Sequence, residues 1–192
     1  MMRLFLVFFF SLNLSLMAQE LPFQSIPKAP TAITSENLLS RMIQGLGFRY
    51  YWASEGLRPE DLAYKPSTSG QSSWETLEHI YGLTEVILNT AKGKASLRPA
   101  ENIPEDFKTL RSKTLHHLDA AVALFQSMKL EDLEKAKVIF DRGGKQSQFP
   151  LWNLINGPIS DALYHTGQVV SFRRSSGNPI PKGVNVFLGV KN

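Results

Sequence analysis

Apolar residues recur at intervals of three and four positions in four stretches of the chain, the pattern of one buried face on an α-helix. These stretches predict four amphipathic helices, at about residues 35–56, 72–92, 104–128 and 159–177. A serine or threonine precedes the first two, where its hydroxyl can cap the helix N-terminus. The start of the fourth helix is open between Pro150 and Ile159, because Pro158 would kink a continuous helix.

Proline, glycine and small polar residues separate the predicted helices. Residues 57–71 are expected to form a loop with one helical turn at 59–62, and residues 95–104 a second linker. Before the last helix, the apolar residues 138–140 and the segment 146–149 flank an Asp-Arg-Gly-Gly sequence, which predicts a short β-hairpin. The pattern therefore predicts an all-α fold, a four-helix bundle with long connections and a short β-hairpin before the last helix.

The N-terminus has the features of a secretory signal peptide. Arg3 precedes an apolar run at residues 4–17, and Ala18 supplies a small residue for cleavage. An uncleaved membrane anchor is the alternative, although the run is short for a bilayer and contains Asn13. Cleavage after Ala18 would make the protein periplasmic or extracellular, without a stable membrane anchor.

The expected organisation has four parts. They are a signal peptide (1–18), an extended leader (19–33), the helical domain (34–177) and an irregular C-terminal tail packed on the bundle (178–192). A chain of 192 residues is long enough for one domain with a real core.

Charge and cysteine content exclude several classes of function. The formal net charge is +4, but lysine and arginine are scattered rather than clustered, so nucleic-acid binding is disfavoured. The sequence contains no cysteine, which excludes disulfides, a cysteine nucleophile and thiolate metal ligands. Any metal site must therefore use histidine and carboxylate ligands.

Three residues could form such a site. Asp161 and His165 are four positions apart on the last predicted helix and share a face, which Gln168 continues. His79 lies off the polar side of the second helix, one helical step from Leu83, and is expected to face partly inward. If the two helices are neighbours, three potential ligands converge. The alternatives are an ordinary Asp–His hydrogen bond and a histidine satisfied within the core.

Three sequence motifs carry a resemblance to a known family. They are Leu-Arg-Pro-Glu-Asp-Leu at 57–62, Ser-Trp-Glu-Thr-Leu-Glu-His-Ile at 73–80 and Asp-Ala-Leu-Tyr-His-Thr-Gly-Gln-Val at 161–169. Together they resemble the DinB-like family, also called DinB/YfiT-like metalloenzymes, over roughly residues 35–177. The resemblance implies a divalent metal held by three histidines, one on the second helix and two spaced by four on the last.

This chain departs from that pattern at one ligand position. His79 matches the first histidine and His165 the last, whereas Asp161 stands at the middle position. Asp161 is either a carboxylate ligand, in a set suited to zinc, nickel, manganese or iron(II), or part of a degenerate site in which it only forms hydrogen bonds. Tyr164 and Gln168 adjoin the pair and are candidate catalytic residues.

The resemblance implies a metal-dependent enzyme without naming its reaction. We expect an exported hydrolase or transferase acting on a small molecule, with metal-activated water favoured over thiol transfer because thiol cosubstrates are mainly cytosolic. The alternative is a noncatalytic helical binding module that has kept the scaffold and lost the site. A homodimer is left open.

Other polar residues are expected to have structural roles. Three glutamates of the second predicted helix form a solvated face, and His116 and His117 lie on the surface of the third. Arg173 and Arg174 are expected to cap the C-terminus of the last helix.

Overall fold

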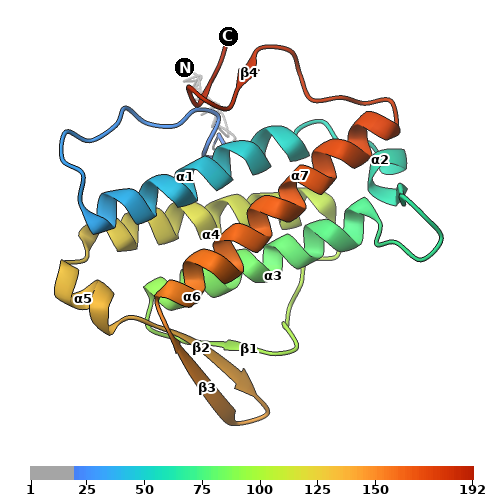
Figure 1. Cartoon of the computed structure of the whole chain (residues 1–192). Coiled ribbons are helices and arrows are strands. Elements are labelled where there is room, and N and C mark those ends of the chain that lie inside the picture. The colour runs from blue at the N-terminus through green and yellow to red at the C-terminus, as the bar shows by residue number, and fades with distance from the viewer. Residues whose placement is uncertain (1–19) are drawn as a thin grey trace, which may run out of the picture.

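The computed structural model describes residues 20–192, so the predicted signal peptide lies outside the described residues. Of these residues 55% are helical and 11% lie in strands, which confirms a mostly helical fold (Figure 1). The four long helices are α1 (Ser35–Ser54), α3 (Ser73–Ala91), α4 (Phe107–Ser127) and α7 (Ser160–Ser175). They correspond to the four helices predicted from the hydrophobic pattern.

Shorter elements connect the long helices. The helical ones are α2 (Pro59–Ala63), α5 (Leu130–Lys135), α6 (Trp152–Leu154) and the π-helical turn η1 (Ile155–Ile159). The strands are β1 (Ala95–Leu97), β2 (Lys137–Arg142), β3 (Lys145–Pro150), β4 (Val184–Asn185) and β5 (Val190–Lys191). Helix α2 is the helical turn predicted at residues 59–62.

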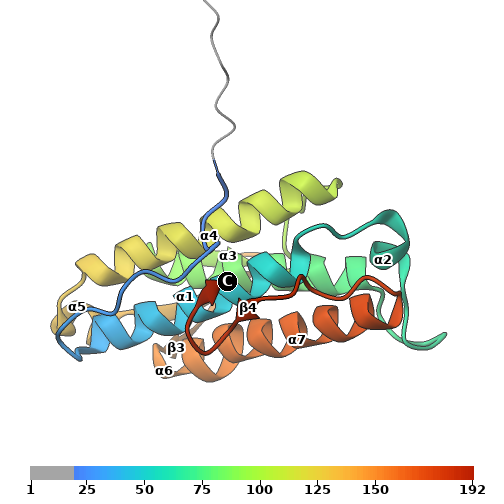
Figure 2. The same cartoon turned by 90° about the horizontal axis from the view of Figure 1, so that it is seen from above.

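Each long helix packs against two others around one apolar core. Helices α1 and α3 each contact both α4 and α7. Helices α1 and α7 run in one direction and α3 and α4 in the other, as the colours of Figures 1 and 2 show. Most of the large apolar side chains that are wholly buried come from the inner faces of α1, α3 and α4, and they include Ile43, Phe48, Leu77, Ile80, Ile87, Leu110, Leu115, Leu118 and Phe125. Helix α7 covers the remaining side with Ala162 and Val169, so the seam between α3 and α7 lies at the surface.

Side-chain caps determine where three of the long helices begin. The Thr34 hydroxyl accepts a hydrogen bond from the amide of Asn37 at 3.4 Å at the start of α1. Ser72 and Glu75 form a reciprocal capping box at the start of α3. Asp106 caps α4 through the amide of Thr109, so α4 begins three residues later than the predicted start at Pro104.

The predicted hairpin is present, and it has a third strand that was not predicted. Strands β2 and β3 pair antiparallel, whereas β1 pairs parallel with β2, with Ala95 opposite Ile139. A strand of three residues is too short to show an alternating pattern, so the sequence predicts only a linker in the segment that contains β1. The sheet joins the connection between α3 and α4 to the connection between α4 and α7.

An irregular turn interrupts the last helical segment but does not split it into two separate helices. Residues from Trp152 onward are helical, but the turn at 155–159 is π-helical and Gly157 departs from helical angles, with φ −97° and ψ −105°. Pro158 has no amide hydrogen to donate, which accounts for the interruption. Regular α-helix therefore begins at Ser160, next to the later of the two predicted starts.

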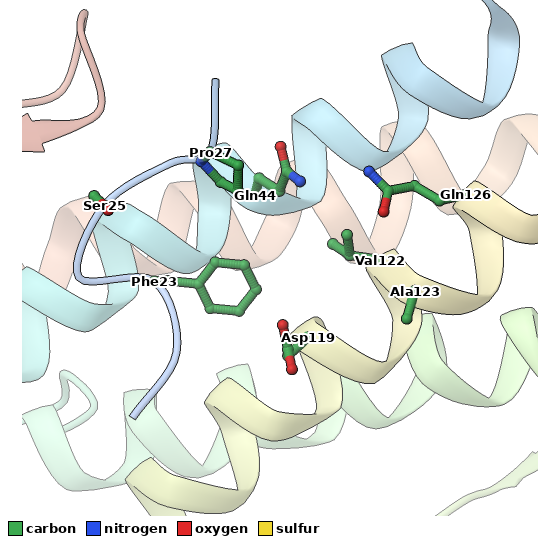
Figure 3. A pocket seen from close by; sticks show the side chains of 8 residues that line it. All are labelled: Phe23, Ser25, Pro27, Gln44, Asp119, Val122, Ala123 and Gln126. Carbon is green, nitrogen blue, oxygen red and sulfur yellow. The ribbon is translucent and has the colours of Figure 1, made fainter. Parts of the chain in front are cut away.

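The leader and the C-terminal tail cover one side of the helices. Phe23 is buried against Gly47 of α1, and the amide of Ile26 donates to the carbonyl of Gly189 in the tail at 2.8 Å. A hollow of about 240 Å³ lies between the leader and helices α1 and α4. Figure 3 shows the side chains that line it, among them Phe23, Gln44 and Val122. Within residues 20–192, no helix combines the length and the hydropathy that a membrane span requires.

Arg173 caps a helix, but not the one to which it belongs. Its side chain is 2% exposed and donates to the carbonyl oxygens of Trp52, Ala53 and Glu55 at the C-terminus of α1, at 2.9 to 3.1 Å. A fourth bond, of 2.6 Å, goes to the carbonyl of Asn178. The predicted capping role thus belongs to the parallel neighbour α1, and Arg174 is exposed.

Candidate metal centre

The structure brings His79, Asp161 and His165 together at the seam between α3 and α7. His79 Nε2 is 3.2 Å from Asp161 Oδ2, and His165 Nε2 is 3.2 Å from Asp161 Oδ1. One ligand atom from each residue lies within 4.8 Å of the other two. The two imidazole rings are nearly perpendicular, with centroids 4.6 Å apart. Residues 82 positions apart in sequence therefore meet at one point.

The burial pattern of α7 explains the position of its two candidate ligands. Ala162, Thr166 and Val169 are buried and define the face that packs on the core. Asp161 and His165 each precede one of these positions by a single residue, so their side chains lie at the edge of that face. This edge borders α3, which contacts α7 along the seam.

His79 differs from the expectation that it faces partly inward. Its side chain is 44% exposed, similar to Asp161 at 42%, while His165 is 15% exposed. Its neighbour Ile80 takes the fully buried position on α3. The imidazole of His79 therefore points along the surface toward α7, and the three-residue group is open to solvent on the side of His79 and Asp161.

Gln168 and Tyr164 lie beside the group, but they do so in different ways. Gln168 Oε1 is 2.7 Å from His165 Nδ1, the ring nitrogen that points away from Asp161. The Gln168 amide nitrogen donates to the hydroxyl of Tyr164 at 3.4 Å. Tyr164 is 64% exposed, and its ring centroid is 5.2 Å from that of His165. Gln168 thus contacts a candidate ligand, whereas Tyr164 is accessible to solvent.

The two histidines of α4 have different surroundings. His116 is exposed, as expected, with its ring Nδ1 2.8 Å from the carbonyl of Ser112. His117 differs from the expected surface position, since it is half-buried against the ring of Tyr81 at 5.1 Å. Burial, reinforced by the charge of nearby lysines, lowers the pKa of His117 to about 4. His117 is therefore neutral at pH 7, and neither histidine belongs to the three-residue group.

A buried carboxylate that the sequence analysis did not single out lies elsewhere. Asp61 of α2 is inaccessible to solvent and accepts hydrogen bonds from Arg58, Ser176 and Asn178, at 2.6 to 3.0 Å. The Arg58 guanidinium is the largest cause that holds the pKa of Asp61 well below its usual range. Asp61 therefore remains ionised and joins α2 to the chain just after α7. The signal available was its place within the Leu-Arg-Pro-Glu-Asp-Leu motif.

Comparisons with known proteins identify the family. The model of the DinB family matches residues 36–184, more than three quarters of the chain. The chain belongs to the DinB family. Among solved structures, a DinB-like protein from Bacillus subtilis has the same fold, with a TM-score of 0.56 and 15% sequence identity over 75% of this chain and 96% of that one. The comparison with curated proteins gave no match.

The candidate ligands fit a divalent metal ion, which members of the DinB family bind. Two imidazoles and a carboxylate suit zinc, nickel, manganese or iron(II), and three protein ligands leave coordination positions open. His79 Nε2 and His165 Nε2 each lie 3.2 Å from a different oxygen of Asp161, so the carboxylate faces both imidazoles, and one ligand atom from each of the three residues lies within 4.8 Å of the others. The aspartate at the middle position is thus compatible with a metal site.

Proposed function

We propose that this DinB-family protein binds one divalent metal ion through His79, Asp161 and His165. The proposal takes the four long helices as a four-helix bundle whose exposed α3–α7 seam carries the site. The observation that carries it is the convergence of three ligand atoms within 4.8 Å, from two helices far apart in sequence. Convergence from separate elements is what distinguishes a ligand set from an i, i+4 pair on one helix.

We further propose that the site serves a metal-dependent hydrolase or transferase acting on a small molecule. A bound divalent cation supplies Lewis acidity, which polarises a substrate bond. Among the chain's own residues, Asp161 lowers the positive charge of the site and Tyr164 presents an exposed hydroxyl and ring at its rim. The exposure of His79 and Asp161 supports substrate access from solvent.

Metal content of the purified, untagged protein tests the proposal. We expect one equivalent of zinc, nickel, manganese or iron per chain, which is lost in His79→Ala and in His165→Ala while the circular dichroism spectrum is retained. His116→Ala, which removes an exposed histidine of α4, is the matched control and should keep the metal. Uptake of none of the four metals by the wild-type protein would overturn the proposal.

Asp161→His tests the unusual ligand position. A third imidazole in place of the carboxylate keeps a ligand atom at the same turn of α7, so zinc binding should persist in this variant and fall in Asp161→Ala. Equal zinc affinity in Asp161→Ala and the wild type would show that Asp161 is not a ligand. Full metal binding without turnover of ester, amide or phosphoester substrates would favour the noncatalytic binding module.

The location of the protein in the cell is proposed separately from metal binding. We propose that the protein is exported, because the basic start, the apolar run and Ala18 form a signal-peptide pattern. N-terminal sequencing of the protein recovered from the periplasm or medium of an expressing bacterium should begin at Gln19. Full-length protein retained in the cytoplasm would contradict export.

A further inference from the structure

We propose that Gln168 is a positioning residue that fixes the tautomer of His165 and so directs the lone pair of Nε2 toward the metal. This inference rests on the proposed metal site and deepens it. It also addresses the alternative in which Asp161 and His165 form only an ordinary hydrogen bond.

The Nδ1 nitrogen of His165 faces Gln168 and not Asp161. Gln168 lies three residues after His165 on α7, and its side-chain oxygen is 2.7 Å from Nδ1. A carbonyl oxygen only accepts hydrogen bonds, so a contact this short requires a proton on Nδ1. The neutral imidazole carries one ring proton, and Gln168 therefore places it on the side away from Asp161.

The Nε2 nitrogen of His165 faces Asp161. With Nδ1 protonated, Nε2 of the neutral ring has a lone pair and no hydrogen. It faces Asp161 Oδ1 at 3.2 Å, and the carboxylate also offers only lone pairs. Two acceptors at this distance repel each other unless a cation lies between them. The neutral tautomer that Gln168 selects is unsuited to an Asp161–His165 hydrogen bond and suited to metal ligation.

The orientation of the Gln168 amide decides whether its oxygen or its nitrogen faces His165. In the structure its nitrogen donates to the Tyr164 hydroxyl at 3.4 Å and its oxygen lies on the side of His165. An amide turned the other way would donate to Nδ1 and move the ring proton to Nε2, where it would bond Asp161. The contact between Gln168 and Tyr164 is long and exposed. Gln168 therefore contributes more than Tyr164 to the choice of the His165 tautomer.

Two substitutions of Gln168 separate the acceptor from the bulk of the side chain. Gln168→Met keeps the length but lacks the acceptor, whereas Gln168→Glu keeps an acceptor and cannot turn into a donor while ionised. Zinc affinity, measured at pH 8 by competition with a chelator, should fall about 10- to 100-fold in Gln168→Met, the usual effect of removing an outer partner of a ligating histidine. Gln168→Glu should bind zinc at least as tightly as the wild type. Gln126→Met, at an exposed glutamine of α4, is the matched control and should change nothing.

A second measurement uses the metal-free protein and separates this inference from the proposed function. Nitrogen-15 NMR of the histidine rings at pH 8 should show His165 protonated at Nδ1 in the wild type and at Nε2 in Gln168→Met. Wild-type His165 protonated at Nε2 would overturn the inference whether or not metal binds. Normal zinc affinity in Gln168→Met would overturn it while leaving the metal site intact. Failure of the wild type to bind any metal would overturn the proposed function and the metal-directing part of this inference, and would leave only the selection of the tautomer by Gln168.

Discussion

At the scale of single residues, Arg173 has the largest fully buried side chain of the described residues. Its guanidinium supplies donors to the C-terminal carbonyls of α1, which have no partner within their own helix. Arginine suits this position because its planar group presents several donors in fixed directions. Arg173 thus shows that an arginine expected to cap its own helix can cap a neighbouring helix instead.

Arg173→Leu is expected to lower the free energy of unfolding by about 3 kcal/mol, because it leaves several buried carbonyl groups without donors. Urea denaturation followed by circular dichroism measures the change. Arg174→Leu makes the same substitution at the exposed neighbour and should change the stability by less than about 0.5 kcal/mol. Equal effects of the two substitutions would contradict the assigned role.

The three candidate ligands could be proposed from the sequence because residue type and spacing can be read from the sequence alone. Asp161 and His165 are neighbours on any helix, and the family resemblance connects His79 to them. The contact between Gln168 and His165 depends on side-chain rotamers, and the burial of His117 depends on how α3 and α4 meet. Neither can be derived from periodicity alone.

At the scale of elements, the sequence predicted the long helices and the hairpin but missed the short pieces. Capping residues and twenty-residue patterns gave the long helices their positions. Helix α5 and strand β1 have six and three residues, and the pairing of β1 with β2 is set by tertiary contacts more than 40 positions apart in sequence. The attachment of the leader to α1 includes one close contact that periodicity does not predict.

That contact is between Phe23 and Gly47, and it predicts a specific effect of a methyl group. A Cβ added at Gly47 would lie 2.6 to 2.8 Å from ring atoms of Phe23, so the leader must move. Phe23 also has φ at +72°, an unfavourable backbone conformation that packing has to maintain. Tryptic cleavage after the exposed Lys28 should therefore be several-fold faster in Gly47→Ala.

Gly45→Ala is the control for this prediction. A Cβ there would meet only the flexible end of Arg49, at 3.4 Å, and alanine is favoured over glycine within a helix by about 1 kcal/mol. This variant should be slightly stabilised and cleaved after Lys28 at the wild-type rate. Unchanged cleavage of Gly47→Ala would show that Phe23 does not hold the leader.

At the scale of the whole molecule, ionic and polar contacts join distant segments at one end of the helices. Asp61 connects α2 to Ser176 and Asn178, more than 110 positions later. Arg111 of α4 contacts Glu55 and the carbonyl of Tyr51 near the end of α1. These contacts lie on the side where α1 and α7 both end, so that this end of the molecule is bound together through side chains.

The buried Asp61 predicts a loss of stability in acid. Its pKa is lowered in the folded protein, so its stabilising effect is fully present above the unfolded pKa of about 3.9 and is lost as the pH falls below that value. Asp61→Asn should lower the free energy of unfolding by about 2 kcal/mol at pH 7. The difference from the wild type should shrink as the pH falls from 4 to 2.5.

Chemical denaturation across this pH range measures the effect. Glu60→Gln is the control, since Glu60 also pairs with Arg58, at 3.2 Å, but is exposed. Its effect should stay below about 1 kcal/mol at every pH. A difference between Asp61→Asn and the wild type that does not vary with pH would contradict an ionised Asp61.

Arg173 fixes one end of α7, and the irregular turn at residues 155–159 precedes the other. Measured from Arg173 at 1.5 Å per residue, His165 lies about 12 Å and Asp161 about 18 Å along the helix axis. A tilt of about 5° around the fixed end would then shift Asp161 by roughly 1.6 Å but His165 by only about 1.0 Å. In the proposed site, Asp161 is thus the candidate ligand that a small tilt of α7 would move farthest.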